Sequence, residues 1–151
     1  MTKLKFLALI PFLLISKTWA CSCMQLSLEE HVNTSNNIYY GQLVSATYVK
    51  PNTEEEWPFI KGTLTVSETL KGEAKHKISI RTGLGGGDCG IQLVVGKYYA
   101  IFIDQDGGYI GSCGASRQVD FHTGHEFLNR VRHVTLQRNV DVFHKKKCLL
   151  K

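Results

Sequence analysis

The sequence predicts a mainly β protein, in which five antiparallel strands form a small, closed or nearly closed barrel with helices packed on it. Stretches rich in β-branched and aromatic residues recur along the chain, and segments rich in glycine, proline and aspartate separate them. Only near the C-terminus do apolar residues take up the three- and four-residue spacing of a helix. A series of short strands followed by an amphipathic helix is typical of such a barrel.

The N-terminus has the pattern of a secretory signal peptide. Lys3 and Lys5 precede an apolar run over residues 6–15, and a short cleavage signal ends at Ala20. The apolar run is about ten residues long, whereas a membrane-spanning helix needs roughly 20, so we expect no permanent membrane span. We therefore expect residues 1–20 to be removed and the protein to be secreted, into either the extracellular space or a periplasm. The remaining residues, 21–151, are enough for one domain.

A cysteine directly after a leader is also the residue that bacterial lipoproteins lipidate. Here Trp19 occupies a position where the lipidation motif has a small residue, and Thr18 stands where the motif prefers leucine. Both positions disfavour lipidation of Cys21. The working hypothesis is therefore a free terminal amine, and a lipidated Cys21 is the alternative.

The strands follow from composition and alternation. A short charged segment, Leu28–Asn33, is compatible with one or two helical turns, and an acidic loop, Pro51–Pro58, separates the first two strands. Apolar residues alternate with polar ones in the second and third strands, as they do when one face of a sheet is buried. The expected strands are Ile38–Val49, Phe59–Leu70, Lys77–Arg81 and Tyr98–Ile103, and a fifth begins at Tyr109–Cys113.

One amphipathic helix closes the series. Thr123 and Glu126 form a capping-box pattern, which predicts that the helix begins there. Apolar and small side chains then recur on one face, at Phe127, Leu128, Val131, Val134 and Thr135. This stripe predicts that the helix packs on the barrel.

Several kinds of site are disfavoured. The glycine loop at 83–90 lacks the phosphate-binding pattern and a following helix. His122 and His125 are three residues apart rather than four, and Glu126 already has a capping role, so we predict no metal site there. No serine or cysteine has a local nucleophile motif. We therefore expect a protein that is not an enzyme and that carries no cofactor.

The charge of the chain does not indicate a nucleic-acid partner. The whole chain carries +5, and the loss of Lys3, Lys5 and Lys17 with the leader leaves +2. The remaining excess is local, at the basic run Lys145–Lys147, which we interpret as a solvated tail.

All five cysteines, Cys21, Cys23, Cys89, Cys113 and Cys148, lie in the secreted part of the chain. An oxidising compartment lets disulfides persist, so four can pair and one is left over, but the sequence alone does not fix the pairing. If Cys21 is the first residue, its α-amine, with an unperturbed pKa of ~7.7, and its carbonyl can chelate a metal ion in a five-membered ring. Disulfides at the first and third residues would hold that chelate rigid.

Five short motifs carry a family resemblance. They are the Cys-x-Cys start, "SETLKG", Cys89-Gly90, "GKYYAIFI" and "GGYIGSCG". In this order, from Cys21 to about Arg138, the chain resembles the N-terminal domain of the tissue inhibitors of metalloproteinases, a netrin-like module. The resemblance implies a five-stranded OB-fold barrel, and it implies disulfides between Cys21 and Cys89 and between Cys23 and Cys113.

The resemblance also implies a function and a site. In that family the terminal cysteine's amine and carbonyl displace the zinc-bound water of a metalloproteinase, and the second residue enters a specificity pocket. Cys21 would then bind the zinc of a target protease in trans, and Ser22 would enter the pocket. The surrounding protease-binding residues would be Cys23, Met24, Asp88, Cys89 and Gly90.

Two alternatives to protease inhibition stay open. The first is a netrin-like module that binds proteins without inhibiting them. The second is an OB-fold that binds a glycan or oligonucleotide through Lys145–Lys147 and exposed aromatic residues such as Tyr39 or Tyr48.

Cys148 has no partner in the implied pairing. We expect either a disulfide to another chain or an inert thiol buried under Leu149 and Leu150. In the first case, the neighbouring lysines would favour the reactive thiolate.

Overall fold

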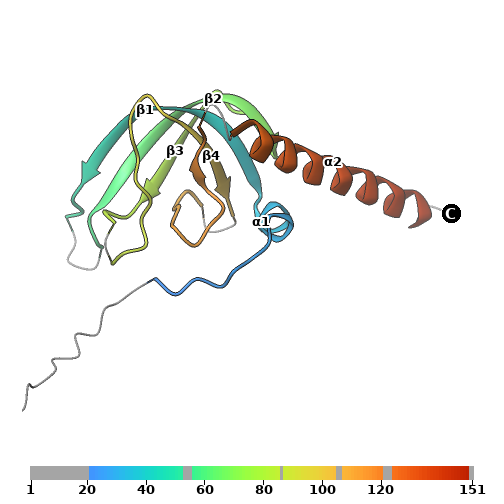
Figure 1. Cartoon of the computed structure of the whole chain (residues 1–151), viewed down its shortest axis with the longest axis horizontal. Helices are drawn as coiled ribbons and strands as arrows, with labels where there is room; N and C mark the ends of the chain where they lie inside the picture. Colours follow the sequence, from blue (N-terminus) through green and yellow to red (C-terminus); the bar gives the residue numbers. More distant parts are fainter. Residues whose placement is uncertain (1–20, 53–55, 86, 105–106, 121–123, 150–151) are drawn as a thin grey trace, which may run out of the picture.

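The computed structural model describes residues 21–52, 56–85, 87–104, 107–120 and 124–149, with the side chains of residues 139 and 141–149 excepted. The expected signal peptide therefore lies outside the described residues, as does Thr123 of the expected capping box. The described chain contains one sheet and two helices (Figure 1).

Five strands form one antiparallel sheet, which makes the fold mainly β as predicted. The strand order is β3-β2-β1-β4-β5. The first four predicted strands are confirmed to within one residue at each end. The observed strands are β1 (Asn37–Val49), β2 (Phe59–Lys71), β3 (Lys77–Thr82), β4 (Tyr98–Ile103) and β5 (Arg117–Gln118).

The prediction that a fifth strand begins at Tyr109–Cys113 is wrong. Gly107 and Gly108 adopt positive φ angles of 71° and 59°, which turn the chain before this segment. The segment then makes only two isolated bridges, through Tyr109 and Gly111, before the chain turns again. The fifth strand forms later, where Arg117 and Gln118 pair with β4.

Over the residues that the structure describes, the sheet is not closed into a barrel, whereas the sequence predicted a closed or nearly closed one. One parallel bridge, between Arg81 and Tyr109, spans the gap between β3 and the segment before β5. There the Arg81 N–H donates to the Gly108 carbonyl at 2.6 Å, and the Ile110 N–H donates to the Arg81 carbonyl at 2.7 Å. The turns on either side of the segment prevent the continuous ladder that closure requires.

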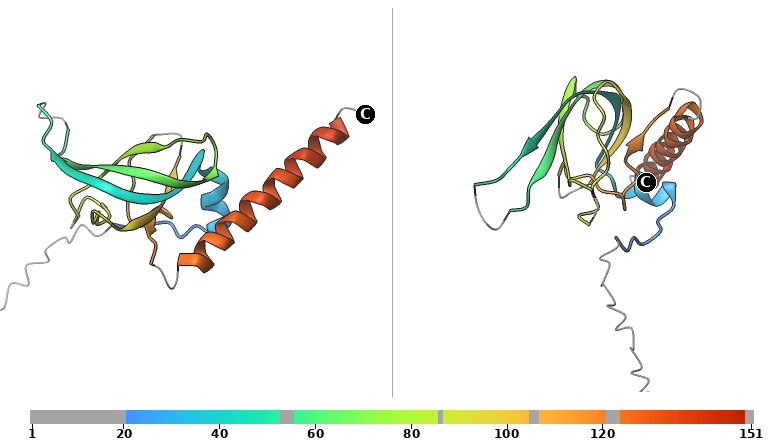
Figure 2. Two further views of the ribbon diagram at one scale, coloured as in Figure 1. Left: turned by 90° about the horizontal axis from the view of Figure 1, so that it is seen from above. Right: turned by 60° about the vertical axis from the view of Figure 1, so that its left-hand side comes forward.

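The long strands β1 and β2 curve strongly (Figure 2). Their pairing shifts register at three places, between Ile38 and Tyr39, between Tyr40 and Gly41, and between Leu43 and Ser45. Such irregularities bend a strand. Gly41 is required at one of them, because a Cβ there would lie 2.3 Å from the Thr65 carbonyl oxygen.

Apolar side chains are buried on both faces of the sheet, because successive residues of a strand point to opposite faces. One core cluster includes Tyr39, Leu43, Leu64, Ile80, Tyr99 and Ile101. The other includes Val32, Ile38, Ala100, Phe102, Leu128 and Val131, and it joins the sheet to both helices.

The first helix, α1 (Leu28–Thr34), is capped at both ends. At its N-terminus the Glu30 N–H donates to the Ser27 hydroxyl at 3.1 Å, and the Ser27 N–H donates to the Glu30 carboxylate at 2.7 Å. At its C-terminus the Lys71 ammonium donates to the carbonyls of Val32 and Ser35. These contacts fix the segment that follows the N-terminal cysteines.

The second helix, α2 (Gly124–Leu149), packs with its first half and projects with its second (Figures 1 and 2). Leu128, Val131 and Thr135 are buried, as the predicted stripe requires. Leu136 and Val140 are 64% and 55% exposed. In the part of the chain that the structure describes, no helix is long and apolar enough to cross a membrane.

Candidate functional site

Two disulfides fix the N-terminal segment to the body of the domain. They join Cys21 to Cys89 and Cys23 to Cys113, across 68 and 90 residues of sequence. This is the pairing that the resemblance implies. Both bonds are intramolecular, so each anchors residues 21–23 to a segment that the sheet positions.

The tripeptide 21–23 has no regular secondary structure and lies at the surface. Cys21 is half-buried, whereas Ser22 and Cys23 are exposed, and Met24 is 79% exposed. Ser22 is thus held between two anchored residues with its side chain toward solvent. The arrangement presents a short, constrained strip of chain that a partner can reach.

The loop that receives Cys21 is organised by Asp88. Its carboxylate accepts hydrogen bonds from the backbone N–H groups of Leu84, Gly85 at 2.9 Å and Gly90 at 3.1 Å. Desolvation alone would raise the pKa of Asp88, but the backbone N–H donors together outweigh it and lower the pKa from its ordinary value. At neutral pH Asp88 is therefore a carboxylate anion, and its hydrogen bonds fix the loop.

Close packing in this loop leaves no room for a side chain at two glycines. A Cβ on Gly90 would lie 2.5 Å from the Gly83 carbonyl carbon, and a Cβ on Gly83 would meet the Asp88 carboxylate. Cys89 itself adopts a φ of 57°, a left-handed conformation that is uncommon for a residue with a side chain. The loop path is thus tight at the residue that bonds to Cys21.

The segment that receives Cys23 is bonded to the same loop. The Tyr109 hydroxyl donates to the Asp88 carbonyl at 2.9 Å, and the Ser112 N–H donates to the Cys89 carbonyl at 2.7 Å. Gly111 also bridges to Gly90. The structure therefore brings the predicted protease-binding residues into one unit, in which Cys21 and Cys23 are bonded to two mutually bonded loops and Ser22 and Met24 adjoin them in sequence.

A hollow of about 230 Å³ adjoins this unit and shares Asp88 and Tyr109 with it. The Arg81 guanidinium lies over the Phe59 ring in this hollow, 5.5 Å from the ring centroid. Trp57 also lines this hollow and is 87% exposed. Sequence reasoning assigned no role to these residues. The one available signal was an aromatic residue between acidic residues and a proline in the Pro51–Pro58 loop.

Other predicted residues lie apart from this unit. Tyr39 is 1% exposed, and its hydroxyl donates to the Glu73 carbonyl, so its proposal as an exposed ligand-binding aromatic is wrong. Tyr48 is 55% exposed. The side chains of Lys145–Lys147 and Cys148 lie outside the described residues.

Within the described ranges, no group of three or more histidine, cysteine, aspartate or glutamate residues could hold a metal ion. His122, from the segment considered above for a metal site, falls in a gap between those ranges.

Comparison with known proteins gives no family assignment. No protein-family model matches the chain, and no curated protein matches it significantly.

Proposed function

We propose that the mature chain, residues 21–151, is a secreted inhibitor of zinc metalloproteinases. The Cys21 α-amine and carbonyl oxygen bind the active-site zinc of the target in place of its water. The observation that carries this proposal is the pair of disulfides at the first and third residues, with an exposed Ser22 between them. A chelating terminus binds well only when it is preorganised, because ordering a flexible terminus costs conformational entropy.

The chemistry needs a free amine, and leader cleavage after Ala20 supplies it. An α-amine with an ordinary pKa of ~7.7 is partly unprotonated near neutral pH, so its lone pair is available to a Lewis acid. The nitrogen and the carbonyl oxygen of the same residue close a five-membered ring on the metal. The zinc belongs to the target protease, and the chain supplies ligands only.

Ser22 is small, polar and exposed, which suits a residue that enters the target's specificity pocket without filling it. Met24, Asp88 and the Cys89-Gly90 backbone surround it as contact residues. The Asp88 carboxylate accepts hydrogen bonds from loop N–H groups, so its main contribution is to hold Cys89 in place.

The fold that supports this site is proposed to be of the OB type. An OB-fold is a five-stranded, partly open barrel. The observed sheet has five strands, and one parallel bridge spans its open side between Arg81 and Tyr109. The family resemblance of the sequence motifs supports the same assignment.

The test is inhibition of a panel of zinc proteases by two forms of the protein. One form begins at Cys21, and the other carries a single additional alanine before Cys21. The first form should inhibit at least one protease, and the added residue should abolish the inhibition, because it removes the terminal amine from Cys21. Equal inhibition by both forms would exclude chelation by the terminus.

The non-inhibitory interaction module remains the alternative, and the same panel separates it. A module of that kind inhibits no protease with either form. The burial of Tyr39 leaves glycan or oligonucleotide binding with less support, since one of its two suggested aromatic contacts is inside the core.

A further inference from the structure

The outer edge of β1 is unpaired over Ser45–Val49 in the part of the chain that the structure describes. β4 pairs with β1 only as far as Gln42. The last backbone hydrogen bonds on that side are made by Leu43, at 2.9 and 2.8 Å. Beyond this point β1 pairs with β2 alone. An unpaired edge presents a row of backbone N–H and C=O groups that another strand can satisfy.

This edge has none of the usual protection along its length. All residues from Val44 to Tyr48 are exposed, and no charged residue occurs between Gly41 and Val49. Natural edges are commonly shielded by charges, prolines or bulges. Here such features stand only at the two ends, as the irregularity between Leu43 and Ser45 and as Lys50-Pro51.

We propose that two copies of this chain associate through these edges, by antiparallel pairing of Ser45–Val49 about a twofold axis at Thr47. Residues at the two ends of the edge limit the pairing to this stretch and so fix its register. The proposal is independent of protease inhibition.

The edge is complementary to itself in this register. Thr47 faces Thr47 of the partner subunit, and threonine pairs are favourable across antiparallel strands. Ala46 faces Tyr48 of the partner subunit, so a small side chain lies opposite a ring. Ser45 faces Val49 of the partner subunit. No charged residue meets a like charge, and self-association by an isologous interface needs this property.

The position of the edge leaves it accessible. Figure 1 shows the C-terminal end of β1, with the start of β2 beside it, on the opposite side of the molecule from the projecting half of α2. Both views of Figure 2 show the same separation. A second copy can therefore pair with β1 without displacing α2.

The test is the dimer dissociation constant of the mature chain, measured by sedimentation equilibrium up to millimolar concentration. Cys148→Ser is the background for all variants, because it removes any disulfide-linked dimer. Thr47→Lys places two lysines opposite each other and should raise the dissociation constant roughly tenfold or more. Thr47→Glu should do the same. Ser67→Lys adds the same charge at an exposed position of β2 away from the free edge, and it should leave the constant unchanged.

A mixture of the two charge variants distinguishes repulsion from misfolding. An equimolar mixture of Thr47→Lys and Thr47→Glu should form a heterodimer at least as tight as the parent, because the facing charges then attract. A parent chain that stays monomeric up to millimolar concentration overturns the proposal. This is the result expected if the edge binds a different protein instead of a second copy. Undiminished dimerisation of Thr47→Lys, or a mixture that stays monomeric, also overturns it.

Discussion

Asp88 connects the chemistry of one side chain to the position of the candidate site. Its carboxylate accepts hydrogen bonds from three backbone N–H groups of the loop that contains Cys89, and Cys89 forms a disulfide with Cys21. The family resemblance marked Asp88 as a surface contact. The structure adds a second role, in which the Asp88 side chain holds its own loop by hydrogen bonds. This role depends on the path of the loop backbone, so no sequence motif indicates it.

Asp88→Ala should loosen this loop. We expect it to lower the free energy of unfolding by about 1 kcal/mol, as the loss of a typical hydrogen-bond acceptor does. Inhibition by the mature chain should weaken more than stability alone explains, because Cys21 loses its fixed position. Asp104→Ala, which removes an exposed carboxylate elsewhere, is the control and should change neither quantity.

The pH dependence follows from the lowered pKa of Asp88. A carboxyl group with a lower pKa in the folded state stabilises that state above its ordinary pKa of ~3.9, and the contribution is lost as the pH falls through the folded-state value. Denaturant unfolding should therefore show the full difference between parent and Asp88→Ala at neutral pH. An equal difference at pH 7 and in strong acid would contradict the assigned role.

Tyr39 shows where residue-level prediction fails. The composition of a strand indicates which residues point to the same face of the sheet. It does not indicate whether other elements cover both faces. In β1, Ile38 and Tyr39 are both buried, because helices cover one face and the curved sheet encloses the other. Only the tertiary arrangement decides which aromatic residues are exposed.

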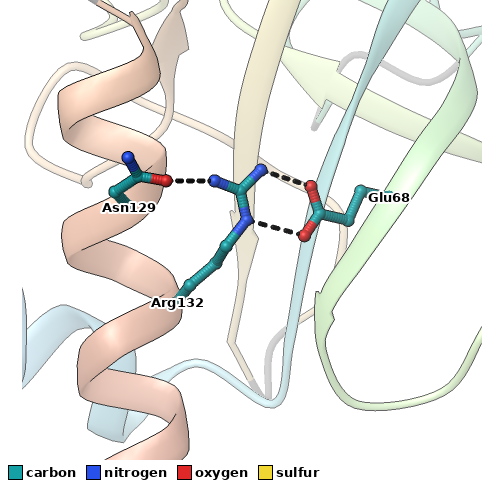
Figure 3. A network of polar contacts seen from close by, with 3 residues as sticks. All are labelled: Glu68, Asn129 and Arg132. Atoms are coloured by element: carbon teal, nitrogen blue, oxygen red, sulfur yellow. Dashed lines mark hydrogen bonds and ion pairs between the residues drawn. The ribbon is translucent and has the colours of Figure 1, made fainter.

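A polar network joins α2 to the sheet (Figure 3). The Arg132 guanidinium donates to both Glu68 carboxylate oxygens, at 2.9 and 2.6 Å, and to the Asn129 side-chain oxygen at 2.6 Å. The hydrogen bonds from Arg132 lower the pKa of Glu68, and those to Glu68 raise the pKa of Arg132. Bidentate pairs of this kind fix geometry as well as adding energy.

Arg132→Met should destabilise the fold by about 1 kcal/mol, since the pair is partly exposed and screened by solvent. Glu68→Gln in addition should cost little more, because the two residues act together, and a double-mutant cycle of unfolding free energies measures this coupling. The lowered pKa of Glu68 means that the contribution holds above its ordinary pKa of ~4.3 and fades as the pH falls below it. Additive effects of the two substitutions would show that the pair is not coupled.

The elements that were predicted well have strong local patterns. β2 and β3 alternate apolar and polar residues, and α2 repeats apolar residues at helical spacing, so their positions follow from burial of one face. The segment after Gly107 and Gly108 has β-favouring residues but bends twice, and its local composition did not reveal that. Its path is set by contacts with Arg81 and with the Cys23 disulfide, which are distant in sequence.

Two disulfides connect residues 21–23 to the open side of the sheet. The Cys23–Cys113 bond closes a loop of 90 residues, and long loops gain most from such a link. Among the described residues, one bridge joins β3 of the open sheet to the segment that contains Cys113. The disulfides therefore stabilise the region where strand pairing is weakest.

Replacing both Cys23 and Cys113 with serine should lower the free energy of unfolding by about 4 kcal/mol. Inhibition should also be lost, because the tripeptide 21–23 is then anchored at Cys21 only. Cys148→Ser changes a cysteine that neither bond uses, and it should leave unfolding of the monomer and inhibition unchanged. A double variant as stable as the parent would contradict the role given to this bond.

Coordination of a target's zinc by the Cys21 amine and carbonyl can be observed at the metal itself. The measurement is the visible absorption spectrum of an inhibited protease whose zinc has been replaced by cobalt, since that spectrum reports the ligands and geometry of the metal. Addition of the chain that begins at Cys21 should change the cobalt spectrum at one equivalent, and the chain with an added alanine should not. Inhibition without a change in the cobalt spectrum would show that Cys21 does not coordinate the metal.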